Sequence, residues 1–86
     1  MSVSTSSVSL FVVKRGQWLR IHQLPHGVLR AQFIRLGINE GERVECIERL
    51  PGGTIVIRKN RQQITIGHLL AKQIFVVVLQ REGIEA

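Results

Sequence analysis

Apolar residues recur at helical spacing in one short stretch of the chain, Leu29–Leu36. The two end residues and Phe33 stand at positions i, i+4 and i+7, so they share one face of a helix of about two turns. Gly37 follows at once, where a helix commonly ends in a left-handed residue that glycine adopts without steric cost. The pattern therefore predicts a short helix that ends at Gly37, with a second tight turn at Gly41.

Outside this stretch the chain alternates between apolar and polar residues in the manner of half-buried strands. The strands that we expect are Leu10–Val13, Gln17–Leu24, Arg43–Arg49, Thr54–Arg58, Arg61–Ile66 and Phe75–Leu79. Turns separate them at Lys14–Gly16, Pro25–Gly27, Leu50–Gly53 and Lys59–Asn60, so that residues 54–66 form a hairpin. Gly67–Gln73 breaks the alternation and is expected to form a helical turn before the last strand. That strand is so apolar that both of its faces must be covered, or one must meet a partner.

The length and the number of short elements indicate the fold class. Eighty-six residues make one domain. We expect it over residues 10–80, between a Ser-rich flexible tail at 1–9 and a C-terminal tail at 81–86. Five or six short strands form a closed or half-closed sheet at this size, because closure hides unpaired strand edges. We therefore expect a mainly β protein, a small SH3-like barrel with one short helix between early strands and a helical turn before the last strand.

The charge balance is basic, with 12 Lys and Arg against 6 acidic residues, all of them Glu. Nine of the cations are Arg, whose planar group pairs well with carboxylates and phosphates. An acidic partner would fit this balance, whether nucleic acid, an anionic membrane surface or an acidic protein face. The arginines form no dense block, which favours a general surface role.

Cysteine content and hydropathy indicate the compartment. A single cysteine, Cys46, excludes an internal disulfide framework and fits a reducing cytosol. The longest apolar run, Ile74–Leu79, has six residues, whereas a membrane-spanning helix needs about 20. The N-terminus has no basic segment and no long apolar segment, so we expect no secretory signal. We therefore expect a cytoplasmic protein with no direct membrane insertion.

The sequence favours no enzyme class. The absence of Asp excludes an Asp-supported triad, and every serine lies within the expected N-terminal tail. No glycine-rich run leads into Lys-Ser or Lys-Thr, so there is no P-loop for a nucleotide. We expect no catalytic residues.

Metal ligation has four weak candidates: His22, His26, Cys46 and His68. The first two have zinc-like spacing only on a helix, and Pro25 between them makes a helix improbable. Small buried thiols such as Cys46 commonly act as apolar filler, and we expect His68 to flank the helical turn. No cofactor is predicted on these grounds, because ligand number and convergence are both missing.

The chain lacks the aromatic residues that two kinds of binding module need, those for single-stranded nucleic acid and those for polyproline peptides. The hairpin residues Arg58, Lys59 and Arg61 put three cations at one turn, but the interleaved aromatics on which single-stranded bases stack are missing. Binding of polyproline peptides needs an aromatic-lined groove, and the chain has no Tyr, one Trp and three Phe. We expect Trp18 to cover an open end of the barrel. Nucleic-acid binding stays an alternative, and peptide binding of the signalling type is disfavoured.

One ordered series of short motifs extends over roughly residues 10 to 80, and its most specific part runs from Arg35 to Val44. The segments that carry it are Gly16, Ile21, Leu24–Gly27, Arg30–Ile38, Gly41–Val44, Pro51–Gly53, Val56–Arg58, Ile64–Ile66, Leu70–Ala71 and Ile74–Val76. In order and spacing this series resembles the core domain of the FeoA family, the ferrous iron transport protein A. The chain departs from that pattern at Glu40, where many relatives have Pro, and in a shorter loop at 51–54.

The resemblance implies an SH3-like barrel that acts in the cytoplasm as an accessory to ferrous iron uptake. It would bind and support or regulate a membrane transporter of the FeoB type, with Fe²⁺ as the associated transition metal. A related barrel occurs as the C-terminal domain of metal-dependent iron repressors, and this chain shows no winged-helix segment before it. A transition-metal-sensing domain remains an alternative.

The surface that would contact such a partner is expected at two places. The helix exit offers Leu36, Gly37 and Ile38, where one of the two apolar side chains is a docking point or both fill the core. The hairpin cations form the second place. The Val-rich strand Phe75–Leu79 would also allow a homodimer if it lies at a sheet edge.

Overall fold

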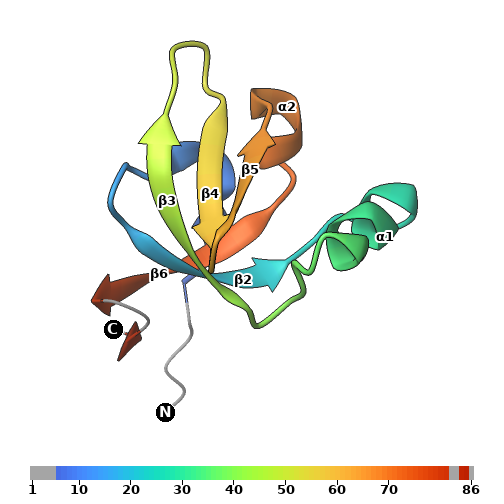
Figure 1. Ribbon diagram of the computed structural model, residues 1–86, viewed down its shortest axis with the longest axis horizontal. Helices are drawn as coiled ribbons and strands as arrows, with labels where there is room; N and C mark the ends of the chain where they lie inside the picture. Colours follow the sequence, from blue (N-terminus) through green and yellow to red (C-terminus); the bar gives the residue numbers. More distant parts are fainter. Residues whose placement is uncertain (1–5, 82–83, 86) are drawn as a thin grey trace.

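The computed structural model describes residues 6–81 and 84–85, and its strands form one curled antiparallel sheet (Figure 1). The longer strands are β2 (Trp18–Gln23), β3 (Arg43–Arg49), β4 (Ile55–Lys59), β5 (Gln62–Ile66) and β6 (Phe75–Arg81). Two-residue strands flank them, β1 (Val8–Ser9) and β7 (Ile84–Glu85). The helical elements are the 3₁₀ turn η1 (Leu10–Val12), helix α1 (Val28–Arg35) and the single turn α2 (His68–Ala71).

The strand order is β1-β6-β2-β3-β4-β5, and β7 also pairs with β6. Three consecutive strands, β3 to β5, form a meander through the loop at 50–54 and a tight turn at Asn60, whose φ is +56°. Figure 1 shows α1 at one side of the curled sheet, beyond the end of β2, while α2 lies beside the end of β5. The expected helix between early strands and the expected helical turn before β6 are both confirmed.

The core lies inside the curl and follows the alternation of the strands. In β2, Leu19 and Ile21 are buried and their neighbours are not, and β3 repeats this with Val44 and Cys46. The buried core is completed by residues from every part of the fold: Leu10, Val13, Leu24, Phe33, Ile38, Ile55, Ile57, Ile66, Ala71, Ile74 and Val76. Burial on one face of each strand fixes the register, because a slip of one residue would turn this apolar set outward.

The first apolar segment was expected as the strand Leu10–Val13, and this prediction is wrong. The segment forms η1, because the Ser9 hydroxyl caps it by accepting a hydrogen bond from the Phe11 N–H at 3.1 Å. Leu10 and Val13 are buried at a spacing of three, which suits a 3₁₀ turn. Both expected tails, 1–9 and 81–86, are also too long, since Val8 and Ser9 form β1, Arg81 ends β6, and Ile84–Glu85 form β7. The tail residues 1–5, 82–83 and 86 lie outside the described residues.

Strand β6 was considered as an edge for homodimer formation, and the structure places it inside the sheet. One side of β6 pairs with β2 along its length, and the other pairs with β1 and β7. Its apolar side chains serve both faces: Val76 belongs to the core, and Val77 and Leu79 are buried outside that cluster. Both faces of β6 therefore carry buried side chains, and among the described strands β6 has neighbours on both sides, which disfavours it as an edge for a homodimer.

Candidate functional site

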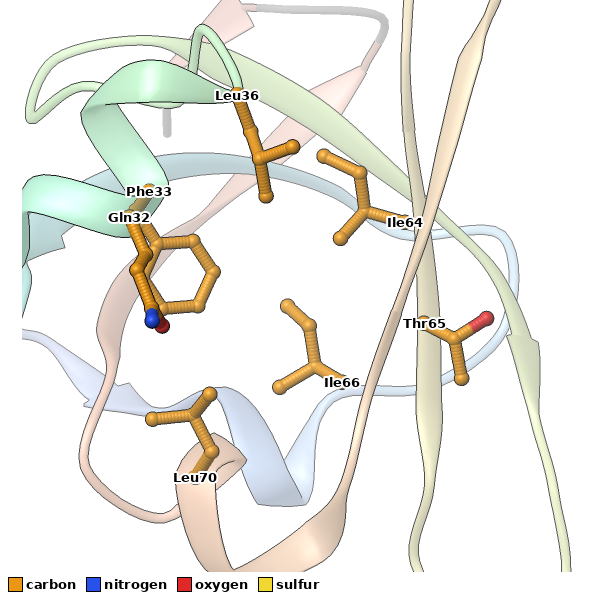
Figure 2. A pocket seen from close by; sticks show the side chains of 7 residues that line it. All are labelled: Gln32, Phe33, Leu36, Ile64, Thr65, Ile66 and Leu70. Carbon is orange, nitrogen blue, oxygen red and sulfur yellow. The ribbon is translucent and has the colours of Figure 1, made fainter. Parts of the chain in front are cut away.

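An apolar groove lies where α1 approaches β5 and α2. Its hollow has a volume of about 130 Å³ and is lined by seven residues: Gln32, Phe33, Leu36, Ile64, Thr65, Ile66 and Leu70. Figure 2 shows five apolar side chains around the hollow, whereas the Thr65 side chain points away from it. Dinucleotides and drug-sized ligands need pockets of about 300–1,000 Å³, while an apolar cavity of about 150 Å³ holds benzene. The groove is therefore of the size of one apolar side chain.

The wall formed by α1 is fixed by one buried anchor and by the way the helix ends. Phe33 is the buried residue of α1 and belongs to the core. At the helix end the Ile38 N–H donates to the Phe33 carbonyl at 2.9 Å, and the Gly37 N–H donates to the Ile34 carbonyl at 2.9 Å. Gly37 has φ +87°, the left-handed conformation expected there. The chain turns sharply, so that Ile38 enters the core while Leu36 stays at the groove.

An ion pair holds the start of α1 to the loop on its other side. Arg30 donates two hydrogen bonds to the Glu40 carboxylate, at 2.8 and 3.0 Å, and the same carboxylate accepts the Leu24 N–H at 3.1 Å. The bond from Arg30, followed by that from Leu24, lowers the pKa of Glu40 from 4.5 to about 2. Glu40 thus connects α1, the end of β2 and the turn before β3.

A lysine connects the helix exit to the β4–β5 hairpin. The Lys59 ammonium donates to the Gly37 carbonyl at 2.5 Å and pairs with the Glu42 carboxylate at 3.1 Å. It therefore satisfies a carbonyl at the end of α1, where helical carbonyls lack partners within the helix. The two places expected from the sequence for a partner surface, the helix exit and the hairpin, are joined through this side chain.

The predicted contact residues divide into exposed and buried ones. Leu36 is 43% exposed and lies at the groove, whereas Ile38 is buried in the core and offers no docking point. The structure thus excludes the alternative in which both side chains fill the core, and a docking role for Leu36 stays a prediction. Val28 and Ile34 on α1 are also exposed, and Phe33 is the buried residue of this helix. Most of the apolar side chains of α1 therefore face outward.

Most of the hairpin cations form ion pairs with glutamates. Arg58 donates to the Glu45 carboxylate at 2.8 Å, and Lys59 is held as described above. Arg61 has no ionic partner within the described ranges 6–81 and 84–85. Two of the three hairpin cations thus already pair with glutamates, which weakens the nucleic-acid alternative.

The four candidate metal ligands lie on separate elements. His22 is on β2, His26 is in the turn before α1, His68 begins α2, and Cys46 lies in β3. In the part of the chain that the structure describes, no group of three or more His, Cys, Asp or Glu side chains could hold a metal. Burial raises the pKa of the Cys46 thiol, whose sulfur lies 3.7 Å from the Glu48 carbonyl. This thiol is a core residue.

The groove itself was missed by the sequence analysis, although both of its walls were predicted. The helical face with Phe33 and Leu36 and the alternation of Ile64 with Ile66 were recognised separately. Nothing in the spacing showed that these two apolar faces would meet.

No helix of the described residues is long and apolar enough to span a membrane.

Comparison with known proteins identifies the family. The model of the FeoA domain matches residues 8–78. The chain belongs to the FeoA family. Membership implies involvement in ferrous iron transport, and the family comprises small accessory domains and is not a known family of enzymes. No curated protein sequence matches this FeoA-family chain.

Solved FeoA structures share its fold. The crystal structure of the iron uptake regulatory protein FeoA has a TM-score of 0.74 at 24% identity, over 86% of this chain and 100% of that chain. The FeoA-like protein of Clostridium acetobutylicum has a TM-score of 0.76 at 22% identity, over 92% and 94%. The FeoA protein of Chlorobium tepidum has 0.76 at 23%, over 88% and 75%. The expected SH3-like, mainly β fold is confirmed.

A fourth structure bears on the repressor alternative. The metal-dependent transcriptional regulator MtsR has a TM-score of 0.75 at 16% identity, over 84% of this chain but 36% of that chain. The similarity therefore concerns a part of the regulator. It confirms that the FeoA fold also occurs inside a metal-dependent transcriptional regulator, and it shows a shared fold alone.

Proposed function

We propose that this chain is a cytoplasmic accessory protein of ferrous iron uptake that binds a FeoB-type transporter through the groove between α1, β5 and α2. The observation that carries the proposal is the apolar hollow itself, which is the size of one side chain and has the exposed Leu36 at its rim. Such a hollow suits an anchor residue of a protein partner, because buried anchors in pockets carry much of the affinity of an interface.

The distribution of charge supports a protein partner with an acidic surface. Every glutamate carboxylate within residues 6–80 has a cationic neighbour, the pairs being Glu40–Arg30, Glu42–Lys59, Glu45–Arg58 and Glu48–Arg15. The excess positive charge therefore belongs to cations such as Arg35 and Arg61, which have no ionic partner among the described side chains. Arg35 precedes Leu36, and Arg61 begins the turn into β5, so both flank the groove in sequence. A partner that presents an apolar anchor residue surrounded by acidic side chains would complement this surface.

Membership of the FeoA family supports a membrane transporter as the partner of this surface. Ferrous iron transport needs a membrane transporter, and the chain contributes no membrane-spanning helix within the described residues. A separate permease of the FeoB type would therefore move Fe²⁺, and this domain would support or regulate it by contact on the cytoplasmic side. Iron is the cargo of that transporter in this proposal.

The test is direct binding between the purified chain and the cytoplasmic part of the FeoB-type transporter of the same organism, measured by calorimetry. The exposed 43% of Leu36 corresponds to about 1 kcal/mol of apolar burial, since a fully buried leucine contributes about 1.5–3 kcal/mol. Leu36→Ala should weaken binding about fivefold, and Leu36→Asp should weaken it further because a charge would enter the apolar hollow.

A matched control uses an exposed leucine outside the groove. Leu69 is 68% exposed and does not line the hollow, so Leu69→Asp should bind the cytoplasmic part with the affinity of the parent chain. If Leu36→Asp binds as tightly as the parent, the groove is not the docking site. If the parent chain shows no binding, the transporter is not its partner.

A further inference from the structure

A second surface lies around the ring of Phe11, which contacts the His68 ring at the start of α2. Two cations contact this ring: the Arg49 guanidinium carbon and the Lys72 ammonium each lie 5.1 Å from its centroid. The His68 ring lies 6.3 Å from it, tilted by 54°. We use the name Phe11 face for Phe11 and its ring contacts Arg49, His68 and Lys72, together with the exposed residues next to them in sequence, Val12, Leu50 and Leu69.

Backbone and side-chain contacts between three separate elements build this face. The Arg49 guanidinium, at the end of β3, donates to the carbonyls of Phe11 and Val13, the second at 3.2 Å. The Ser9 hydroxyl donates to the Ala71 carbonyl at 3.1 Å, which holds η1 against α2. The loop at 50–54 approaches the same ring so closely that a Cβ placed on Gly53 would lie 2.5 Å from Phe11 Cε1. The face is therefore a packed part of the fold.

Aliphatic side chains protrude from each of these three elements. Val12 of η1 is 55% exposed, Leu50 after β3 is 39% exposed, and Leu69 of α2 is 68% exposed. Exposed aliphatic groups beside cations and an aromatic ring are typical of surfaces that enter the headgroup region of a bilayer.

The local charge has one sign. Arg49 and Lys72 contribute positive charge, and neither forms an ion pair with any carboxylate among the described side chains. The acidic neighbour in sequence, Glu48, pairs with Arg15 at 3.9 Å. An anionic lipid surface attracts such cations, and the aliphatic groups between them gain by leaving water.

We propose that the Phe11 face binds an anionic membrane surface peripherally. The occupant is a layer of acidic phospholipid headgroups, contacted by Arg49 and Lys72, with Val12, Leu50 and Leu69 entering the boundary of the acyl chains. Leu70 of the same helical turn lines the groove, so α2 contributes to both surfaces. This contact does not depend on the transporter and would orient the groove at the bilayer.

The test is co-sedimentation of the full chain with vesicles that contain either phosphatidylcholine alone or phosphatidylcholine with 30% phosphatidylglycerol. Binding is expected to the anionic vesicles only, and it should fall as salt is raised from 0.05 to 0.5 M. Lys72→Gln should weaken binding about fivefold, since a cation near an anionic bilayer contributes about that factor. Leu69→Gln should weaken it as well, through loss of apolar insertion.

Two matched controls test whether the contact is directional. Arg61→Gln removes an exposed cation from the hairpin, and Leu36→Gln removes an exposed leucine from the groove, so both should retain parental binding to vesicles. Equal weakening by Lys72→Gln and Arg61→Gln would show a general effect of net charge and would overturn the proposal. Absence of binding by the parent chain would do the same.

NMR spectra identify the contacting residues independently. Addition of anionic vesicles should broaden the amide signals of Val12, Leu50 and Leu69 and leave those of Ile64 and Leu36 unchanged. If soluble polyglutamate shifts the first group while vesicles do not, the face binds an acidic polypeptide, and the membrane assignment is wrong.

Discussion

Two glycines with nearly the same backbone conformation provide a sharp test of what the fold requires. Gly37 and Gly53 have φ values of +87° and +90°, which L side chains rarely adopt. A Cβ on Gly37 would meet one atom, Lys59 Nζ at 3.9 Å, an ordinary contact. A Cβ on Gly53 would lie 2.5 Å from Phe11 Cε1 and 2.9 Å from His68 Cβ. Alanine at the first position adds backbone strain, and at the second it adds strain together with a collision.

The expected magnitudes differ accordingly. Gly37→Ala should destabilise the fold by about 1–2 kcal/mol, the cost of a left-handed residue that has a Cβ. Gly53→Ala should cost about 2–5 kcal/mol, because overpacking adds about 1–3 kcal/mol to the same strain. Since about 1 kcal/mol shifts the melting temperature of a domain of this size by about 4–8 °C, the two variants should be clearly separated.

Urea unfolding followed by circular dichroism measures both free energies. Asparagine separates the two causes, because it tolerates the left-handed region better than alanine does. Gly37→Asn should therefore recover part of the stability that Gly37→Ala loses, whereas Gly53→Asn should recover none. Equal losses for Gly37→Ala and Gly53→Ala would refute the reasoning from contact distances, and an unchanged Gly37→Ala would show that the helix exit tolerates a side chain.

Three further results are expected. Because folding lowers the pKa of Glu40 from 4.5 to about 2, its contribution to stability is complete above about pH 4.5 and is lost as the pH falls toward 2. Glu40→Gln should flatten that part of the stability profile, by a small amount since Glu40 and Arg30 are 34% and 35% exposed; an unchanged profile would contradict the ion pair. Ile38→Ala should cost about 2–5 kcal/mol in urea unfolding, and a loss below about 1 kcal/mol would contradict its place in the core. Cys46, buried with a raised pKa, should react with a thiol reagent slowly in the native state and rapidly in urea, and rapid native labelling would contradict its burial.

Local patterns predicted the elements well where one residue pair decides the geometry. Phe33 and Gly37 determine where α1 buries its one anchor and where it ends, and both were evident from spacing. The alternation of Leu19 with Ile21 likewise predicted which face of β2 is inward. At Leu10 the same reasoning failed, because a run of four apolar residues fits a strand as well as a 3₁₀ turn.

The sequence did not predict which elements make long-range contacts with one another. The groove forms because Leu36 and Ile64, which are far apart in the chain, face the same hollow. Periodicity predicts which residues share one face of an element, but it does not predict which other element packs against that face. The polar contacts of Glu40 could not be predicted for the same reason. Its partners, Arg30 and Leu24, belong to the preceding helix and to the end of a strand. Which elements meet depends on the path of the chain in three dimensions.

The position of β6 has a consequence for how the protein acquires its structure during synthesis. Val8 of β1 and Ile21 of β2 both pair with Val76, so β1 and one side of β2 find their backbone partner in a late segment. Nascent β2 must therefore remain half-paired until residue 81 has left the ribosome, while the meander β3–β5 can already close. Pairings over such separations slow folding, and the nascent chain would be most exposed to aggregation or to chaperones in that interval.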